Sequence, residues 1–146
     1  MKALVVYDSV YGNTKKIAET VAAELGKGVK VISVSDFNNK DLTGINVLVV
    51  GSPILAFRPS EKTSKFLASL SAGQLKGVKA TAFDTRVRIF FHGDAANKIA
   101  KGLQLAGAEI VAEPCGFIVE GREGPLAIDA VEKAKEWAGS IKAKVK

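Results

Sequence analysis

Short apolar runs alternate with amphipathic segments along the whole chain. The runs predict five strands, at residues 3–7, 29–34, 47–50 and 80–83, with the last at 110–112 and resuming at 117–119. Most runs are continuous rather than alternating, and several are rich in Val and Ile, as is typical of strands that are covered on both faces. The pattern therefore predicts a central parallel sheet.

Between these runs, hydrophobic residues recur every three or four positions, which is the period of a helix with one buried face. Gly26 and Gly107 follow the first and third stripes, where they can end a helix. Ser60 and Asp94 precede the second and third stripes as candidate N-caps. The polar section 36–44 predicts a short helix or an irregular crossover. The stripes are Ile17, Val21 and Leu25; Thr63, Phe66, Leu67 and Leu70; Ala96, Ile99, Ala100 and Leu103; Val131, Ala134, Trp137, Ala138 and Ile141.

Strands that alternate with helices predict right-handed crossovers and a doubly wound α/β fold. The sheet would form the middle of a three-layer sandwich. At 146 residues we expect one domain, residues 1–146. Periodicity alone does not give the strand order.

The composition limits the kinds of reactive and metal-binding sites that this chain can form. Cys115 is the only cysteine, so intrachain disulfides and thiolate metal clusters are excluded, and we expect it to act as a small hydrophobic residue. His92 is the only histidine, and no metal site is expected. No apolar run approaches the roughly 20 residues of a membrane span, and Met1 and Lys2 lead directly into a strand. We therefore expect a cytoplasmic protein without a secretory signal.

The formal net charge is +6, with a sequence pI near 9.5. This balance favours acidic partners or anionic ligands. The lysines are scattered among acidic residues, and the chain has no stripe of mixed aromatic and basic residues. Nucleic-acid binding is therefore not expected.

Three loops should meet where the parallel strands end, because ligands of open parallel sheets bind outside the carboxyl ends of the strands. These loops are residues 8–14, 51–59 and 84–93. The first has the layout of a phosphate-binding turn. Gly12 permits close approach of the backbone, Ser9 and Thr14 offer hydroxyls, and Asn13 offers an amide at a helix start.

The same residue types also cap ordinary strand–helix turns, so a purely structural turn is the alternative. The loop lacks the lysine of a nucleoside-triphosphate P-loop and the three-glycine spacing of a dinucleotide fingerprint. Neither a Walker-type ATPase nor a nicotinamide-binding fold is supported.

Three segments carry a resemblance to a known family. Residues 7–18, YDSVYGNTKKIA, resemble the flavin mononucleotide (FMN) phosphate loop of the flavodoxin family. Residues 49–53, VVGSP, resemble its third strand and the start of its first flavin-flanking loop, and residues 82–86, AFDTR, the start of its second. The resemblance covers the whole chain, which has the length of the short-chain members of this family. With Tyr11 before the glycine, the first loop is most similar to flavodoxin domains of diiron flavoproteins.

The resemblance implies a five-stranded sheet in the order 2-1-3-4-5 with FMN at the point where the crossover direction reverses. The phosphate would bind the first loop, and the isoalloxazine ring would lie between the other two, with Phe57 or Phe90 able to stack on it. The implied cofactor-binding residues are Ser9, Tyr11, Gly12, Asn13, Thr14, Pro53, Ile54, Leu55, Phe57, Thr85, Arg86 and Phe90.

The sequence departs from the family pattern at two points, and these change what we expect of Tyr11 and of the flavin's reduction potential. Many members carry a hydroxyl where Tyr11 stands, so we expect this residue to contribute only its N–H, with the ring facing elsewhere. Electron-carrying flavodoxins are typically acidic around the flavin, whereas Arg58, Arg86 and Arg88 occupy the flanking loops here. Positive charge should raise the potential of the second electron step, by an interaction on the order of 1–3 kcal/mol.

The resemblance implies an FMN-binding electron carrier with no catalytic side chain, which exchanges one or two electrons with redox partner proteins that have acidic docking surfaces. One alternative is an FMN-dependent oxidoreductase of the NAD(P)H/quinone or protoporphyrinogen type. Another is a binding module of the same fold without flavin. A receiver-type signalling domain is disfavoured, because Asp8 has no acidic neighbour and the third strand ends in Gly51-Ser52-Pro53 rather than in an aspartate. The electron donor and acceptor, the potentials and the oligomeric state are not readable from the sequence.

Overall fold

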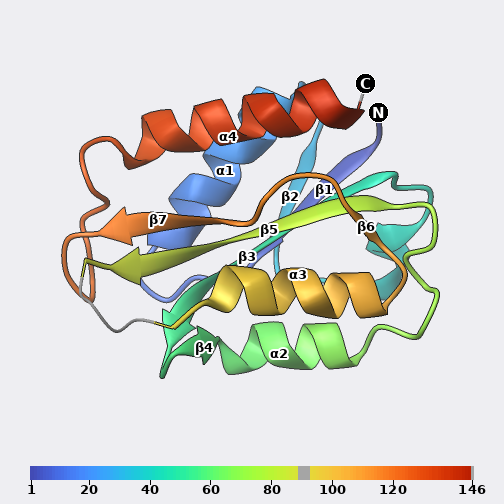
Figure 1. Ribbon diagram of the computed structural model, residues 1–146, viewed down its shortest axis with the longest axis horizontal. Helices are drawn as coiled ribbons and strands as arrows, with labels where there is room; N and C mark the ends of the chain where they lie inside the picture. Colours follow the sequence, from blue (N-terminus) through green and yellow to red (C-terminus); the bar gives the residue numbers. More distant parts are fainter. Residues whose placement is uncertain (89–92, 146) are drawn as a thin grey trace.

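A parallel sheet forms the middle layer of the computed structural model, which describes residues 1–88 and 93–145 (Figure 1). Its order is β2-β1-β3-β5, followed by an outer position that β6 and β7 share, each pairing with β5. This confirms the order 2-1-3-4-5 and the interrupted last strand. The strands are β1 (Ala3–Tyr7), β2 (Lys30–Ser33), β3 (Val47–Leu55), β5 (Lys79–Val87), β6 (Glu109–Ile110) and β7 (Cys115–Val119).

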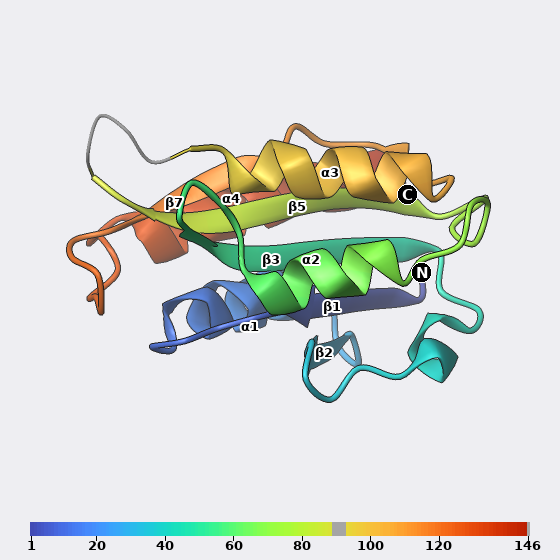
Figure 2. The same ribbon diagram turned by 90° about the horizontal axis from the view of Figure 1, so that it is seen from below.

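Helices cover both faces of the sheet (Figures 1 and 2). On one face lie α1 (Asn13–Leu25) and α4 (Ala130–Val145), and on the other lie α2 (Glu61–Ala68) and α3 (Ala95–Leu105). Each pair buries its apolar stripe against the sheet, which gives one hydrophobic cluster per face. Among the described residues, no helix is both long and apolar enough to cross a membrane.

The predicted helix ends agree with the structure. The Ser60 hydroxyl accepts a hydrogen bond from the Thr63 N–H at 3.3 Å, and the Asp94 carboxylate accepts one from the Asn97 N–H at 3.1 Å. Gly26 caps the end of α1. The polar crossover contains the short 3₁₀ helix η1 (Asn39–Leu42). Leu70 differs from the prediction, because α2 already ends at Ala68 and Leu70 packs against the core from the following turn.

Two strands are longer than predicted. β3 continues beyond residue 50 to Leu55, and β5 continues beyond residue 83 to Val87. The polar residues at these positions do not end the strands, because they have hydrogen-bond partners in the fold. The Ser60 N–H donates to Ser52 Oγ at 2.9 Å, and the Ala96 N–H donates to Asp84 Oδ2 at 2.9 Å. Both extensions stay paired within the sheet, 51–53 with 83–85 and 83–87 with 115–119, and they carry these strands beyond the end of β1 toward the candidate site.

The extension of β3 turns back as an antiparallel hairpin that the sequence did not predict. The short strand β4 (Arg58–Pro59) pairs with the end of β3, with Ile54 opposite Pro59 and Leu55 opposite Arg58. Ala56 and Phe57 form its tip, and both have positive φ angles, 51° and 67°.

Candidate functional site

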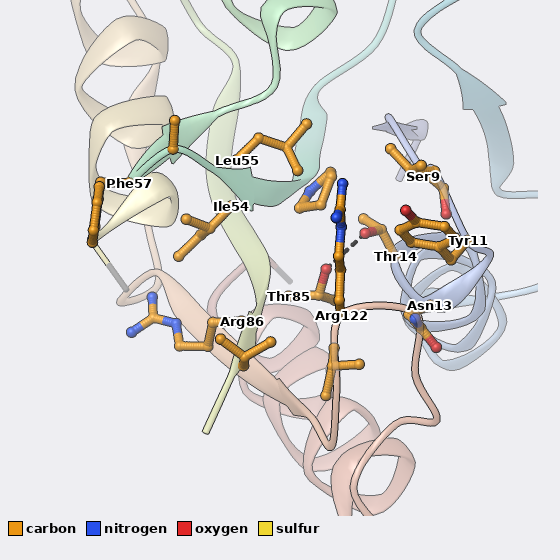
Figure 3. Close-up of a pocket in the computed structure, with 15 residues that line it drawn as sticks. Ser9, Tyr11, Asn13, Thr14, Ile54, Leu55, Phe57, Thr85, Arg86 and Arg122 are labelled. Atoms are coloured by element: carbon orange, nitrogen blue, oxygen red, sulfur yellow. Dashed lines mark hydrogen bonds between the residues drawn. The ribbon is translucent and has the colours of Figure 1, made fainter. Parts of the chain in front are cut away.

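A cavity of roughly 370 Å³ opens at the carboxyl ends of β1, β3, β5 and β7 (Figure 3). Of the twelve residues that the resemblance implied, ten line it: Ser9, Tyr11, Asn13, Thr14, Pro53, Ile54, Leu55, Phe57, Thr85 and Arg86. Gly12 lies in the turn without lining the cavity, and Phe90 lies outside the described residues. The structure thus brings together three segments that are far apart in the sequence.

The turn before α1 presents backbone and hydroxyl donors. Gly12 has φ 96°, a left-handed conformation that suits glycine. Ser9 Oγ accepts hydrogen bonds from the N–H groups of Gly12 at 3.1 Å and Lys15 at 3.3 Å. The amides of Asn13 and Thr14 belong to the first turn of α1, where an N–H has no intrahelical carbonyl to bind. The turn is therefore held by its own serine while the helix start offers donors to an anion.

A buried pair of hydroxyls connects this turn to β5. Thr14 Oγ1 and Thr85 Oγ1 lie 2.8 Å apart in a hydrogen bond, and both residues are buried. This bond fixes the start of α1 relative to the end of β5, on the floor of the cavity.

Asn13 connects the turn to a fourth segment. Its Nδ2 donates a hydrogen bond to the Glu123 carbonyl at 3.1 Å, in the loop between β7 and α4. Gly124 adjoins it with φ 119°, and a Cβ at that position would lie 3.0 Å from Asn13 Oδ1. The side-chain amide that was predicted to face a phosphate thus binds this loop.

Tyr11 differs from the prediction. Its ring was expected to face elsewhere, but it lies on the cavity side of the turn in Figure 3. The residue remains 44% exposed, so the cavity mouth covers only part of the ring.

The hairpin supplies an apolar wall. Leu55 and Phe57 are 44% and 57% exposed, which is unusual for side chains of this size. The hairpin tip is held from behind, because a Cβ on Gly93 would lie 2.3 Å from the Phe57 carbonyl oxygen. Lys98 Nζ also donates to that oxygen at 3.3 Å.

Two of the three arginines of the flanking loops have carboxylate partners. Arg86 donates from Nε and Nη2 to the two oxygens of the fully buried Asp84, at 2.7 and 2.6 Å. Arg88 Nη2 donates to Glu120 Oε1 at 2.9 Å. These hydrogen bonds to carboxylates raise the pKa of each guanidinium above its usual value. Arg86 is therefore paired with a buried carboxylate, and Arg88 with an exposed one.

Five residues of the cavity wall were not among the twelve: Val10, Ala56 and Val87 lie within the three predicted loops, whereas Val119 and Arg122 lie outside them. Arg122 follows the last strand, β7, whose loop was not considered. The signal was available, because the last strand of a parallel sheet ends at the same edge as the others. The sequence Gly121-Arg122-Glu123-Gly124 directly after a strand marks such a loop.

The described residues contain no cluster of His, Cys, Asp and Glu that could hold a metal ion. Cys115 is half-buried against the core, and burial raises the pKa of its thiol. Neither observation adds a reactive group to the cavity.

The sequence profile of the Flavodoxin domain family matches residues 4–87, more than half of the chain. A flavodoxin of Aquifex aeolicus (strain VF5) is 34% identical over 91 residues, which cover 58% of this chain and 49% of that protein. The matched part thus spans about half the length of that relative.

Two solved structures share the fold. Oxidised flavodoxin 1 of Bacillus cereus has a TM-score of 0.84 at 19% identity, with both chains fully covered. The rubredoxin:oxygen oxidoreductase of Desulfovibrio gigas has a TM-score of 0.78 at 20% identity, and the match covers 97% of this chain and 35% of that one.

Proposed function

The chain belongs to the flavodoxin family, and from this premise we propose that it binds FMN in the cavity and carries electrons between redox proteins. The observation that carries the proposal is that one cavity joins a turn of anion donors to an apolar wall. FMN has the same two parts, a dianionic phosphate and a large flat ring.

The residues present fit both parts of this cofactor. The first-turn amides of α1 and the hydroxyls of Ser9 and Thr14 would hold the phosphate, aided by the positive end of the helix dipole. Ile54, Leu55 and Phe57 would cover the ring. Apolar and aromatic contacts orient such a ring and exclude water from it.

Bound FMN would supply the redox chemistry, because a flavin accepts and donates electrons one or two at a time. The part of the chain that this structure describes would bind the cofactor and shape its surroundings. No side chain needs to act as an acid, a base or a nucleophile for this function.

The partners we propose are redox proteins with acidic docking surfaces. Four large apolar residues, Val10, Tyr11, Leu55 and Phe57, are exposed and line the cavity. The chain as a whole carries a net charge of +6. An apolar contact zone on a positively charged molecule would attract acidic partners at long range and pack against them at short range.

Titration of the purified protein with FMN and with riboflavin, which lacks the phosphate, tests the proposal through quenching of flavin fluorescence. We expect FMN to bind more tightly than riboflavin. Thr14→Val should weaken FMN binding by roughly 10- to 150-fold, because a hydrogen bond to a charged group contributes about 1.5–3 kcal/mol. Riboflavin binding should change much less.

Thr20→Val is the matched control. Thr20 also lies in α1, but its hydroxyl donates to the Lys16 carbonyl within the helix and does not line the cavity. Its removal should leave both affinities unchanged. A folded wild-type protein that binds neither flavin would refute the proposed function.

A further inference from the structure

Arg122 is a cation of the cavity wall that the structure leaves available to a ligand. It lies in the loop between β7 and α4 and is exposed. It forms no ion pair with any residue of 1–88 or 93–145, and the other arginine of the wall, Arg86, is bound to buried Asp84. The positive charge that an anionic ligand would meet in this cavity therefore comes from Arg122.

The fold holds the backbone of Arg122 beside the phosphate-binding turn. The next residue, Glu123, accepts the hydrogen bond from Asn13, and Gly124 packs directly against the Asn13 side chain. On the other side, Glu120 N–H donates to the Pro125 carbonyl at 2.8 Å, which closes the loop on itself. The loop that carries Arg122 is thus fixed at both ends.

The side chain of Arg122 extends away from this anchor. Figure 3 shows it running across the cavity, past Thr14 and Thr85, toward the hairpin segment that carries Leu55. In this view the guanidinium lies between Leu55 and Thr14, beside the apolar part of the cavity that suits a flat ring.

We propose that Arg122 is the charge-tuning residue of this cavity, favouring the anionic, two-electron-reduced form of a bound flavin ring over the neutral oxidised form. The inference rests on the proposed function. It also assigns the charge effect that we expected of the flanking arginines to a residue outside those loops, because Arg86 and Arg88 already have carboxylate partners and Arg58 does not line the cavity. The physical basis is the attraction between a guanidinium and a negative charge in a partly desolvated site.

Reductive titration of the FMN-loaded protein with dithionite, against reference dyes, gives the ratio of affinities for reduced and oxidised FMN. Arg122→Gln should lower this ratio about tenfold, which corresponds to about 1.4 kcal/mol. The affinity for oxidised FMN should stay within about twofold of wild type, since the oxidised ring is neutral. Arg122→Lys keeps the charge and should restore most of the ratio.

Lys144→Gln is the matched control for net charge. It removes one exposed positive charge near the end of α4, which runs away from the cavity (Figure 1). We expect it to leave the affinity ratio unchanged. An equal decrease in this variant would overturn the inference, because a general charge effect would then explain the result.

Two further outcomes separate the possible failures. If wild type binds FMN and Arg122→Gln has the wild-type ratio, the inference is overturned and the proposed function stands. If Arg122→Gln instead loses affinity for oxidised FMN but not for riboflavin, the guanidinium acts on the phosphate, and the assignment to the ring is overturned. Failure of wild type itself to bind FMN would remove the proposed function and this inference with it.

Discussion

Gly51 leaves room for the ring of Phe83 on the neighbouring strand. It lies opposite Phe83 in the parallel register of β3 and β5, and a Cβ on Gly51 would lie 2.0 Å from the Phe83 ring. That ring also packs edge to face against Phe117 and Trp137, with centroids 5.9 Å away in each case. Because Phe83 is held from several sides, it cannot move aside for a larger residue.

Gly51→Ala should therefore lower the free energy of unfolding by about 1–3 kcal/mol, the usual range for overpacking a buried site. Gly139→Ala is the control, since a Cβ there, inside α4, meets no atom within 4 Å. That change should stabilise the protein by up to about 1 kcal/mol through helix propensity. Urea unfolding followed by circular dichroism measures both. Equal stabilities for the two variants would contradict the close packing of Gly51.

The local sequence pattern predicted the roles of some residues but not of others. The caps Ser60 and Asp94 were found because a cap acts on amides three residues away. The bond from Asn13 to Glu123 joins residues 110 positions apart, and no local pattern encodes it. The same reason kept Arg122 out of the predicted site, although its place after the last strand could have suggested it.

At the scale of elements, the hairpin at the end of β3 combines exposure with backbone strain. Ala56 and Phe57 both adopt left-handed φ angles, which cost a residue with a Cβ about 1–2 kcal/mol. The sequence pattern ended this strand at residue 50, because nothing local shows that Ser52 is bonded to the Ser60 amide. The core of each strand could be predicted, whereas its end depends on tertiary partners.

Ala56→Gly should stabilise the protein by about 0.5–1 kcal/mol, because relief of the left-handed strain outweighs the added freedom of the unfolded chain. Ala23→Gly is the comparison, at an exposed site within α1. It should destabilise by about 1 kcal/mol, the ordinary cost of glycine in a helix. Thermal and urea unfolding show whether each variant is more or less stable than the wild type. A loss of stability at Ala56 as large as that at Ala23 would mean that the tip is not strained.

At the scale of the whole molecule, the parallel sheet explains why the site forms where it does. All main strands end at one edge, so the loops after β1, β3, β5 and β7 meet there regardless of their distance in sequence. The alternation of strand and helix was sufficient to predict this edge. The strand order came from the family resemblance, because periodicity carries no information on which strands are neighbours.

The net charge of +6 leads to a prediction for small electron acceptors. The dithionite-reduced, FMN-loaded protein should lose electrons to anionic ferricyanide more slowly as ionic strength rises from about 10 to about 300 mM, because salt screens the attraction. With the cationic tris(phenanthroline)cobalt(III), the rate should rise instead. Stopped-flow absorbance measures both rates. A change in the same direction for both acceptors would show that the long-range field does not control encounter.

The start of β1 and the end of α4 lie at the edge of the sheet that faces away from the cavity (Figure 1). β1 begins there, and α4 runs back to the same edge after β7 has ended at the opposite one. A polypeptide or a surface linker that is fused to either terminus would therefore extend from the edge of the sheet opposite the cavity. The protein could be tethered to an electrode in this way with the mouth of the cavity still directed at the solution.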